Sequence, residues 1–353
     1  MYQKIIDFDN LHAAAMACRN GKRRSPAALR YFSRLEENLF DAHNHLISRT
    51  YQPGEYEQFY VYEPKQRLIS APRFADRVIH RAIINVLEPV MDRRFIFDSY
   101  ACRKGKGAHA GADRVQRFMR IVKRNHGAVY CLKADISKYF ASIRHAELKE
   151  MLARHINCQD TLNLLGLIID SSPGVPGVGI PLGNLTSQLF ANMYLHELDR
   201  FVKHELRERY YCRYMDDFIV VSHDKAHLAE IRKRIEHFLW ARLGLQTNSK
   251  TQIFPIGKHG GRALDFLGYR IYPTHRLLRK CSVKRIKYKI RRMREGLATG
   301  VITLQQCKPA IQSWIAHTSH ANTYRLRKSL FSEPMIKGAK NDKNISARRH
   351  LSL

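Results

Sequence analysis

Acidic residues are scarce in this 353-residue chain, which holds 31 Asp and Glu against 61 Lys and Arg, a formal net charge of +30. An excess of this size favours a polyanionic partner, most simply nucleic acid, over a merely solubilising surface. From Arg270 onward the chain carries 20 Lys and Arg but 3 Asp and Glu. More than half of the excess positive charge therefore lies in the last quarter of the sequence.

Paired cysteines and long apolar runs are also missing. The seven cysteines are scattered, and no two have C-x-x-C spacing, so the sequence predicts neither a zinc site nor a disulfide framework. Isolated thiols are typical of a reducing compartment, which predicts a cytoplasmic location. No apolar run is long enough to span a bilayer and the N-terminus does not have the pattern of a signal peptide, so we expect no membrane partner.

Two adjacent carboxylates, Asp216 and Asp217, interrupt a run of aromatic and β-branched residues. Residues 210–214 and 218–222 each have the composition of a strand, which predicts a hairpin with both carboxylates at its tip. Like charges placed side by side repel each other and lose solvation on burial. A solvated turn is one explanation, since Asp is common in turns. A bound divalent cation is the other.

A third carboxylate, Asp135, ends the strand predicted in HGAVYCLKADISKYF. Adjacent strands of one sheet could bring it to Asp216 and Asp217. Nucleotidyl transfer needs two divalent ions about 3.5–4 Å apart, held by carboxylates, to activate a hydroxyl and stabilise the leaving pyrophosphate. Mg²⁺ keeps several of its waters and needs few carboxylates. We therefore expect a site for two Mg²⁺ ions, with Mn²⁺ as an alternative ion.

Strand and helix patterns alternate along the chain, which predicts a mixed α/β fold. Residues 1–50 have helical patterns, and residues 56–73 alternate like a β-hairpin. The glycine-rich, basic segment 102–114 predicts a loop. Residues 187–210 predict one long helix.

The C-terminal part of the sequence is the most basic. In residues 283–294, apolar residues occupy one helical face and Lys and Arg the others. This pattern predicts a helix that packs on one side and meets a phosphate backbone on the other, although a solvated basic face would give the same pattern. The segment 336–353 is basic and poor in core residues, which predicts disorder.

The order of these motifs resembles that of the reverse transcriptases, over residues 55–335. KADISKYFASI resembles the first palm motif, GIPLGNLTSQLFANMYLHELD the motif that backs the nucleotide, and RYMDDFIV the catalytic hairpin. LQTNSKTQIF and LDFLGYRIY resemble the two palm motifs that follow. KQRLISAPRFADRVIHRA and FIFDSYACRKGKGAH resemble fingers motifs of bacterial and group II intron-like enzymes.

This resemblance implies an α/β right-hand polymerase with fingers, a palm built on an antiparallel sheet, and a helical thumb. The N-terminal helices and fingers would span 1–105, and the palm 106–270 with a fingers insertion at about 145–185. The thumb would span 271–335.

The resemblance also implies roles for individual residues. Asp135, Asp216 and Asp217 would be catalytic. Asp135 and Asp216 would bind both metal ions, Asp217 would complete the metal site as a transient ligand, and the backbone carbonyl of Ile136 would be a further ligand. Phe140 would be a steric gate against ribose, although core packing would also explain an aromatic residue there. Nucleotide binding would fall to Lys65, Arg67, Phe140, Leu182, Gly183 and Lys250. Nucleic-acid binding would fall to Tyr214, Met215, Leu267, Gly268, Lys284, Lys287 and Arg291.

One motif narrows the resemblance. Most reverse transcriptases have Ser-Pro where this chain has Ser187-Gln188, and the Ser-Gln form resembles the enzymes of diversity-generating retroelements, as does SWIAHTSHANTYRLRKSL. Those enzymes copy a template-repeat RNA with errors opposite adenine, so that a target gene is diversified. The resemblance implies dNTPs, template RNA, cDNA, the RNA–DNA duplex and a small basic helical-bundle accessory protein as partners. Leu182 stands where retroviral enzymes have Gln, and an apolar side chain there would loosen nucleotide selection.

Two alternatives remain open. A retron or a stand-alone group II intron-like reverse transcriptase would share every motif except Ser187-Gln188. A non-catalytic nucleic-acid-binding protein would share the charge, but the intact set of Asp135, Asp216 and Asp217 argues against it.

Overall fold

The computed structural model describes residues 1–62, 65–257, 260–332 and 335. The chain forms two compact units, Met1–Pro255 and a second that begins at Ile256. The second unit therefore includes strands that the sequence analysis assigned to the palm. The segment 336–353, for which we predicted disorder, lies outside the described residues.

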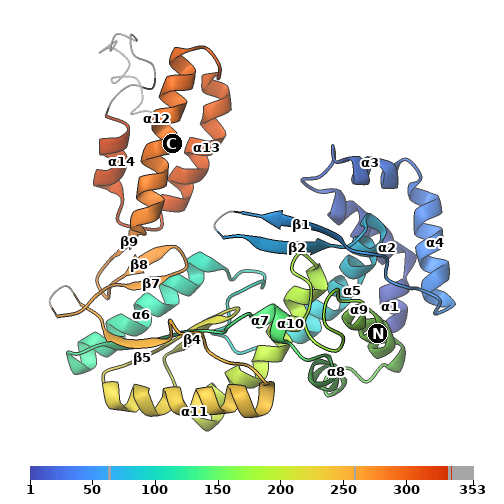
Figure 1. Ribbon diagram of the computed structural model, residues 1–353, viewed down its shortest axis with the longest axis horizontal. Coiled ribbons are helices and arrows are strands. Elements are labelled where there is room, and N and C mark those ends of the chain that lie inside the picture. The colour runs from blue at the N-terminus through green and yellow to red at the C-terminus, as the bar shows by residue number, and fades with distance from the viewer. Residues whose placement is uncertain (63–64, 258–259, 333–334, 336–353) are drawn as a thin grey trace. The chain divides into compact units, whose positions relative to one another are not determined.

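Four short helices open the first unit, and they pack around a longer one, α5 (Phe74–Asp92) (Figure 1). The side chain of Asp7 caps α2 by accepting from Asn10 N. Ser25 caps α3 by accepting from Ala28 N, with Pro26 in the first turn. The four helices are α1 (Tyr2–Ile6), α2 (Phe8–Arg19), α3 (Pro26–Phe32) and α4 (Leu35–Ile47).

The hairpin predicted at 56–73 is present. β1 (Glu57–Val61) pairs antiparallel with β2 (Arg67–Ala71), and the register joins Val61 to Arg67. All residues of β1 are exposed, whereas Ser70 of β2 is buried. Residues 63 and 64 at the predicted tip lie outside the described residues.

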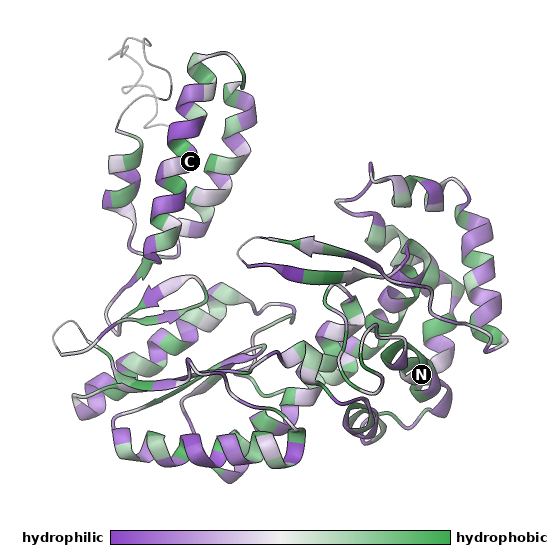
Figure 2. Cartoon of the chain, in the orientation of Figure 1, coloured by the Kyte–Doolittle hydropathy of each residue, from purple (hydrophilic) through white to green (hydrophobic). Residues whose placement is uncertain are grey.

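A four-stranded antiparallel sheet in the order β4-β5-β3-β6 forms the centre of the first unit. Leu132, Ala134, Phe218 and Val220 alternate along β3 and β5 and lie in the main hydrophobic core, as the period of two requires. Figure 2 shows hydrophobic and hydrophilic residues alternating along the helices of this unit. The strands are β3 (Tyr130–Asp135), β4 (Tyr211–Tyr214), β5 (Asp217–Ser222) and β6 (Gln252–Pro255).

Helices pack against this sheet and against one another. α11 (Lys225–Leu243) contacts β3, β5 and β6, and its first turn is capped by Asp224. α8 (His145–Ala153) and α9 (Gln159–Asp170) form a pair in the predicted fingers insertion, and α8 also contacts α10 (Leu185–Arg200).

Two elements differ from the sequence predictions. The segment 102–114 is a loop only as far as Gly107, which has a φ of 114°. α6 (Ala108–His126) begins at the next residue, buries Gly111 and Ala112 near its start, and packs against β4 and β5. The long helix predicted at 187–210 is also wrong in extent. α10 ends at Arg200, a π-helical turn (Phe201–Glu205) follows, and Arg207 adopts a φ of 57° that no helix can continue.

The second unit joins a small sheet to helices. β7 (Leu264–Phe266), β8 (Tyr269–Ile271) and β9 (Arg276–Leu278) form an antiparallel meander. Ile286 and Ile290 of α12 are buried with Leu330, as the amphipathic pattern predicts. The helices are α12 (Lys280–Ala298), α13 (Leu304–Thr318) and α14 (Tyr324–Leu330). Among the helices of the described ranges, none is both long and apolar enough to cross a bilayer.

Candidate active site

The hairpin between β4 and β5 turns on two residues, Met215 and Asp216, because Tyr214 pairs with Asp217. Met215 has a φ of 57°, whereas Asp216 does not have a positive φ. This is the pattern of a type II′ turn, in which the first central position usually belongs to glycine. A methionine in this conformation is strained, and strain of this kind clusters at functional sites.

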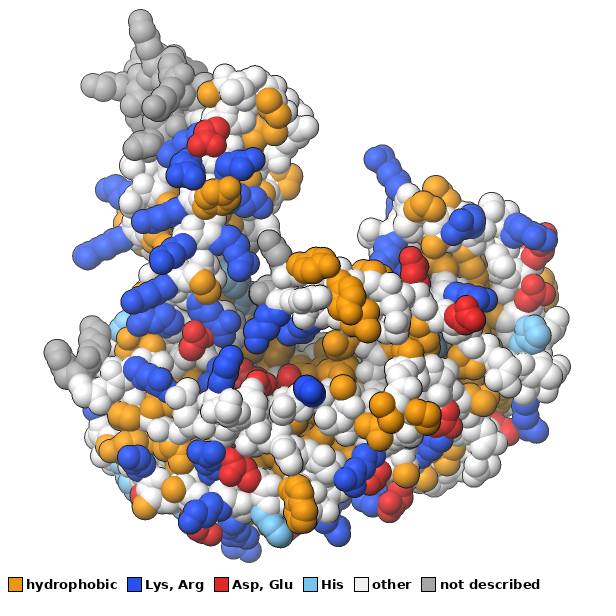
Figure 3. Space-filling view, viewed as in Figure 1, with side chains coloured by type: hydrophobic (Ala, Val, Ile, Leu, Met, Phe, Trp, Pro, Cys, Tyr) orange, Lys and Arg blue, Asp and Glu red, His pale blue; other side chains and the backbone are white. Residues whose placement is uncertain are grey.

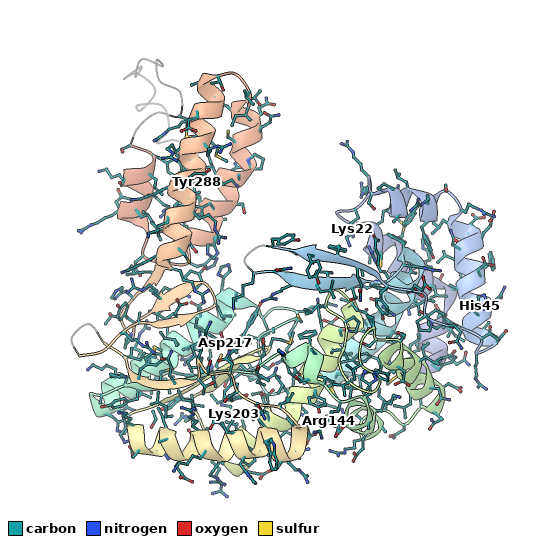
Figure 4. The ribbon with its side chains drawn as sticks, in the orientation of Figure 1. Lys22, His45, Arg144, Lys203, Asp217 and Tyr288 are labelled. Atoms are coloured by element: carbon teal, nitrogen blue, oxygen red, sulfur yellow. The ribbon has the colours of Figure 1, made fainter. Side chains whose placement is uncertain are left out.

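Three carboxylate residues lie at this end of the sheet. Asp135, the last residue of β3, is the register partner of Asp217, the first residue of β5 (Figure 4 labels Asp217). The backbone N–H of Ile136 donates to the carbonyl of Asp216 at 3.2 Å, which ties the turn to the end of β3. Like charges directly opposite each other on neighbouring strands are destabilising, so cations beside these carboxylates would stabilise the site.

Burial raises the pKa of Asp216, and the charge of Asp135 raises it further. The positive charges of Arg67 and Arg213 act in the opposite direction, but the net shift remains upward. The Asp216 carboxylate therefore lies near the charge of Asp135 in a partly desolvated place where its ionised form is costly. A divalent cation between the two would remove that cost.

The third carboxylate already has a protein cation. Nζ of Lys133, on β3, lies 3.7 Å from Oδ2 of Asp217. Asp135 is held differently: the side-chain amide of Asn248 donates to its Oδ2, and the backbone N–H of Asn248 donates to its carbonyl at 2.8 Å. Asp135 is thus held by Asn248, while Asp217 lies beside Lys133.

The donor set fits a hard divalent ion. Within the described ranges, no three His, Cys, Asp or Glu side chains come together as a ready metal cage. Mg²⁺ does not require one, because it keeps several waters and is commonly held by one or two carboxylates together with substrate phosphates. Asp135 and Asp216 are the residues that would hold such ions, which supply activation of the attacking hydroxyl and charge neutralisation at the leaving group.

The residues predicted to contact the nucleotide differ in how near they lie to the carboxylates and in how buried they are. Arg67, at the start of β2, is close enough to Asp216 to lower its pKa, and Lys65 is exposed two residues before it. Phe140 lies on α7 (Tyr139–Ser142), half-buried against the main core, with its ring 5.6 Å from that of Tyr139. Both interpretations of Phe140, as steric gate and as packing residue, remain compatible with this position.

Leu182 and Gly183 contact β2. The backbone N–H of Ser70 donates to the carbonyl of Leu182 at 2.9 Å. Gly183 has a φ of 111°, and a Cβ there would stand 2.8 Å from Cγ2 of Ile69 and 3.3 Å from the carbonyl oxygen of Ser70. The glycine thus allows the loop to approach the strand, a reason that the sequence analysis did not anticipate.

The remaining predicted site residues divide between the two units. Lys250 is exposed, and its N–H donates to the side chain of Asn248 at 2.8 Å, two residues from the contact to Asp135. Tyr214 and Met215 flank the carboxylates and are partly buried. In the second unit, Leu267 and Gly268 form the turn between β7 and β8, while α12 exposes Lys284, Lys287 and Arg291.

Sequence reasoning missed the residues that hold the site in place. Asn248 and Lys133 touch Asp135 and Asp217, and Arg213 donates from β4 to the carbonyl of Met215 while paired with Asp199 of α10. The one feature of the sequence that could have indicated such a residue is Arg213, a charged residue within an apolar strand. A buried charge needs a partner, but the sequence does not identify it.

Comparisons with known proteins agree with this geometry. The family model for reverse transcriptase (RNA-dependent DNA polymerase) matches residues 62–271, more than half of the chain. The chain is 27% identical to the protein YkfC of Escherichia coli K12, over 71% of this chain and 74% of that protein. It is also 27% identical to the group II intron-encoded protein LtrA of Lactococcus lactis subsp. cremoris, over 47% of this chain but only 28% of that protein.

A solved structure shares the fold. Apo telomerase from Candida tropicalis, truncated from its C-terminal domain, superimposes with a TM-score of 0.50 at 14% identity, covering 65% of this chain and 55% of that one. This likeness concerns the fold alone. Together with the matched family model it confirms the right-hand polymerase fold expected from the sequence.

Proposed function

Because the chain belongs to the reverse transcriptase family, we propose that it copies an RNA template into cDNA from dNTPs, using two Mg²⁺ ions held by Asp135 and Asp216. The observation that carries this proposal is the pairing of Asp135 with Asp217 at the ends of adjacent strands, with Asp216 in the turn beside them. Mn²⁺ would substitute, since it prefers the same oxygen donors.

The residues around the carboxylates have separate tasks in this proposal. Arg67 and Lys65 would bind the triphosphate from β2 and the residues before it, since cationic side chains stabilise transferring phosphoryl groups. Lys250 would act near the pyrophosphate. Phe140 would lie against the sugar, and the segment of Leu182 and Gly183 would back the nucleotide.

The second unit would bind the product duplex. α12 presents Lys284, Lys287 and Arg291 at positions three and four residues apart, opposite the buried Ile286 and Ile290. Figure 3 shows Lys and Arg side chains gathered over the helices of this unit. A face of this kind suits the phosphates of an RNA–DNA duplex, with Leu267 and Gly268 at a turn of the same unit as further contacts.

We propose further that the enzyme is of the diversity-generating retroelement type, which copies a template-repeat RNA with errors opposite adenine and works with a small basic accessory protein. Ser187-Gln188 and the apolar Leu182 support this proposal. Gln188 lies in the first turn of α10, where it is exposed, and Leu182 offers no side-chain hydrogen bond to a nucleotide. Weak polar discrimination would permit misincorporation.

A stand-alone group II intron-like reverse transcriptase is the second candidate. The similarity to a group II intron-encoded protein favours it, although this chain spans little more than a quarter of that protein. The two candidates differ in fidelity, because only a diversifying enzyme should concentrate its errors at adenine.

Deep sequencing of cDNA tests both levels of the proposal. Purified protein would be given an RNA template, dNTPs and Mg²⁺, beside an Asp216→Ala control. Product that disappears in the control supports the polymerase, and errors concentrated opposite adenine support the diversifying type. Faithful product favours the intron-like candidate. Leu182→Gln should lower the adenine errors, and unchanged errors would remove the role proposed for Leu182.

A further inference from the structure

A fully buried ion pair adjoins the catalytic turn. Arg213 of β4 donates from Nε and Nη2 to the two carboxylate oxygens of Asp199 on α10, at 2.7 and 2.6 Å, and both side chains are 0% exposed. The hydroxyl of Tyr211 donates to the same carboxylate at 2.7 Å. Apolar residues of similar volume would fill this space without the desolvation cost of two charges. Packing alone therefore does not explain the pair.

The third guanidinium nitrogen reaches the turn. Nη1 of Arg213 donates to the carbonyl oxygen of Met215 at 3.0 Å and to Oδ1 of Asn192 at 3.2 Å. Met215 is the residue held at a φ of 57°, a conformation that costs a non-glycine residue roughly 1–3 kcal/mol. Such a conformation persists only where its surroundings hold it.

The Met215 carbonyl shares a peptide plane with the N–H of Asp216, because the peptide bond is planar. Holding that oxygen therefore fixes the plane on the N-terminal side of Asp216. The plane on its C-terminal side is held by Ile136, whose N–H donates to the Asp216 carbonyl at 3.2 Å. With both planes fixed, the direction of the Asp216 side chain is set.

We propose that Arg213, anchored by Asp199, is a positioning residue that holds the strained Met215–Asp216 turn and thereby directs the Asp216 carboxylate toward Asp135. The guanidinium is fully buried, so we assign it no direct contact with nucleotide or metal. It acts through the Met215 carbonyl, and its charge is neutralised by Asp199 so that it does not compete with a cation at the site. This proposal rests on the proposed polymerase function only for the activity measurement, because metal binding can be measured without polymerisation.

Arg213→Lys tests this role, because lysine keeps the charge but cannot bind Asp199 with two nitrogens and reach Met215 with a third. We expect kcat to fall by roughly 10- to 100-fold, as for a misplacement of about 1 Å, with KM for dNTP changed by less than about twofold. Binding of Mn²⁺ alone, followed by electron paramagnetic resonance, should weaken by about 10-fold, the equivalent of about 1.4 kcal/mol. This second readout requires no polymerisation.

A matched control distinguishes positioning from general destabilisation. The side chain of Arg103 is 7% exposed and is paired with a carboxylate, that of Asp92, which is 41% exposed. Arg103 also donates to the carbonyls of Ile96 and Ser99 but not to the turn. Arg103→Lys should lower the melting temperature as Arg213→Lys does and leave Mn²⁺ binding unchanged.

Met215→Gly supplies the decisive comparison, since glycine adopts a positive φ without strain. In the Met215→Gly protein, Arg213→Lys should lower the affinity for Mn²⁺ by less than about twofold, because the turn no longer needs to be held. An equal loss with and without Met215→Gly would overturn the proposal. If Arg213→Lys does not fold, Asp199→Glu keeps the pair but shifts the guanidinium, and unchanged Mn²⁺ binding in that folded variant would also overturn it.

Discussion

At the scale of single residues, Asp216 has opposing requirements. A metal ligand should be ionised, yet burial and the neighbouring Asp135 raise its pKa and make the ionised form costly in the metal-free protein. The folded protein therefore binds a proton at Asp216 more tightly than the unfolded chain does. By linkage, the metal-free protein loses stability as the pH rises from about 4 through the folded-state pKa of Asp216.

Asp216→Asn should remove this penalty. At pH 7 without divalent ions, we expect the variant to melt above the natural protein, by roughly 2 °C for each kcal/mol of penalty removed. The difference should narrow as the pH is lowered toward 4, and Mg²⁺ should raise the melting temperature of the natural protein alone. Differential scanning calorimetry measures all three. Asp41→Asn, at an exposed position on α4, is the control, and a difference independent of pH would contradict the prediction.

The sequence predicted the carboxylates of this site but not the residues that hold them. Two adjacent acids in an apolar run are visible in a local window, and so is Asp135 at the end of a strand. Asn248 is 113 residues from Asp135, and the amide has no local pattern that distinguishes it from a surface residue. The partner of Arg213 is on a helix whose packing the sequence does not specify.

At the scale of elements, the segment containing Leu182 and Gly183 is joined to β2. Ser70 donates to Leu182, and Gly183 leaves no space for a Cβ beside Ile69. Motif resemblance predicted a role for Gly183 toward the nucleotide. The contact with β2 became visible only once the strand and the loop were placed together, because it depends on a pairing between distant segments.

Gly183→Ala should disrupt the contact between this loop and β2. The new methyl group would overlap Ile69 in a backbone conformation that already strains alanine, so we expect a loss of stability of roughly 2–4 kcal/mol by urea denaturation. Gly174→Ala is the matched control, because Gly174 has a φ of 124° but no atom within 4 Å of the place that a methyl group would take. The control should lose only the strain component, roughly 1 kcal/mol. Equal losses would mean that the contact with Ile69 contributes nothing.

Element boundaries were the weakest predictions. The start of α6 was missed because glycine and alanine at 107–112 have the composition of a loop, whereas burial of Gly111 and Ala112 is what stabilises a helix there. The end of α10 was missed because the apolar pattern continues past Arg200 into the π-helical turn. Tertiary packing determined both boundaries, and local propensity does not contain that information.

At the scale of the whole molecule, the net charge of +30 is concentrated in the C-terminal part of the chain. In the second unit, α12 places its cations on the faces that Ile286 and Ile290 leave exposed. The sequence predicted this arrangement because a helical period of 3.6 residues separates the apolar and basic positions directly.

Removing three of these cations should change the salt dependence of binding. For Lys284→Ala, Lys287→Ala and Arg291→Ala combined, we expect the slope of log K against log salt concentration to become shallower by about 3 on an RNA–DNA duplex, about one per lost phosphate contact. Fluorescence anisotropy at several salt concentrations measures the slope. A control that removes the same charge from α11, at Lys225, Lys233 and Arg234, should leave the slope unchanged. An identical change in both proteins would assign the effect to net charge alone.

The contact between β2 and the loop that contains Gly183 limits how the sequence of this protein can change in evolution. The β1–β2 hairpin is a separate stretch of sequence, so recombination between related genes could exchange it as one segment. A hairpin that brought a side chain as large as isoleucine to position 69 would meet Gly183 across a gap too narrow for one extra carbon atom. The hairpin and the loop must therefore remain sterically compatible. Recombination that combines a hairpin and a loop from different enzymes should be selected against, even when each segment is intact.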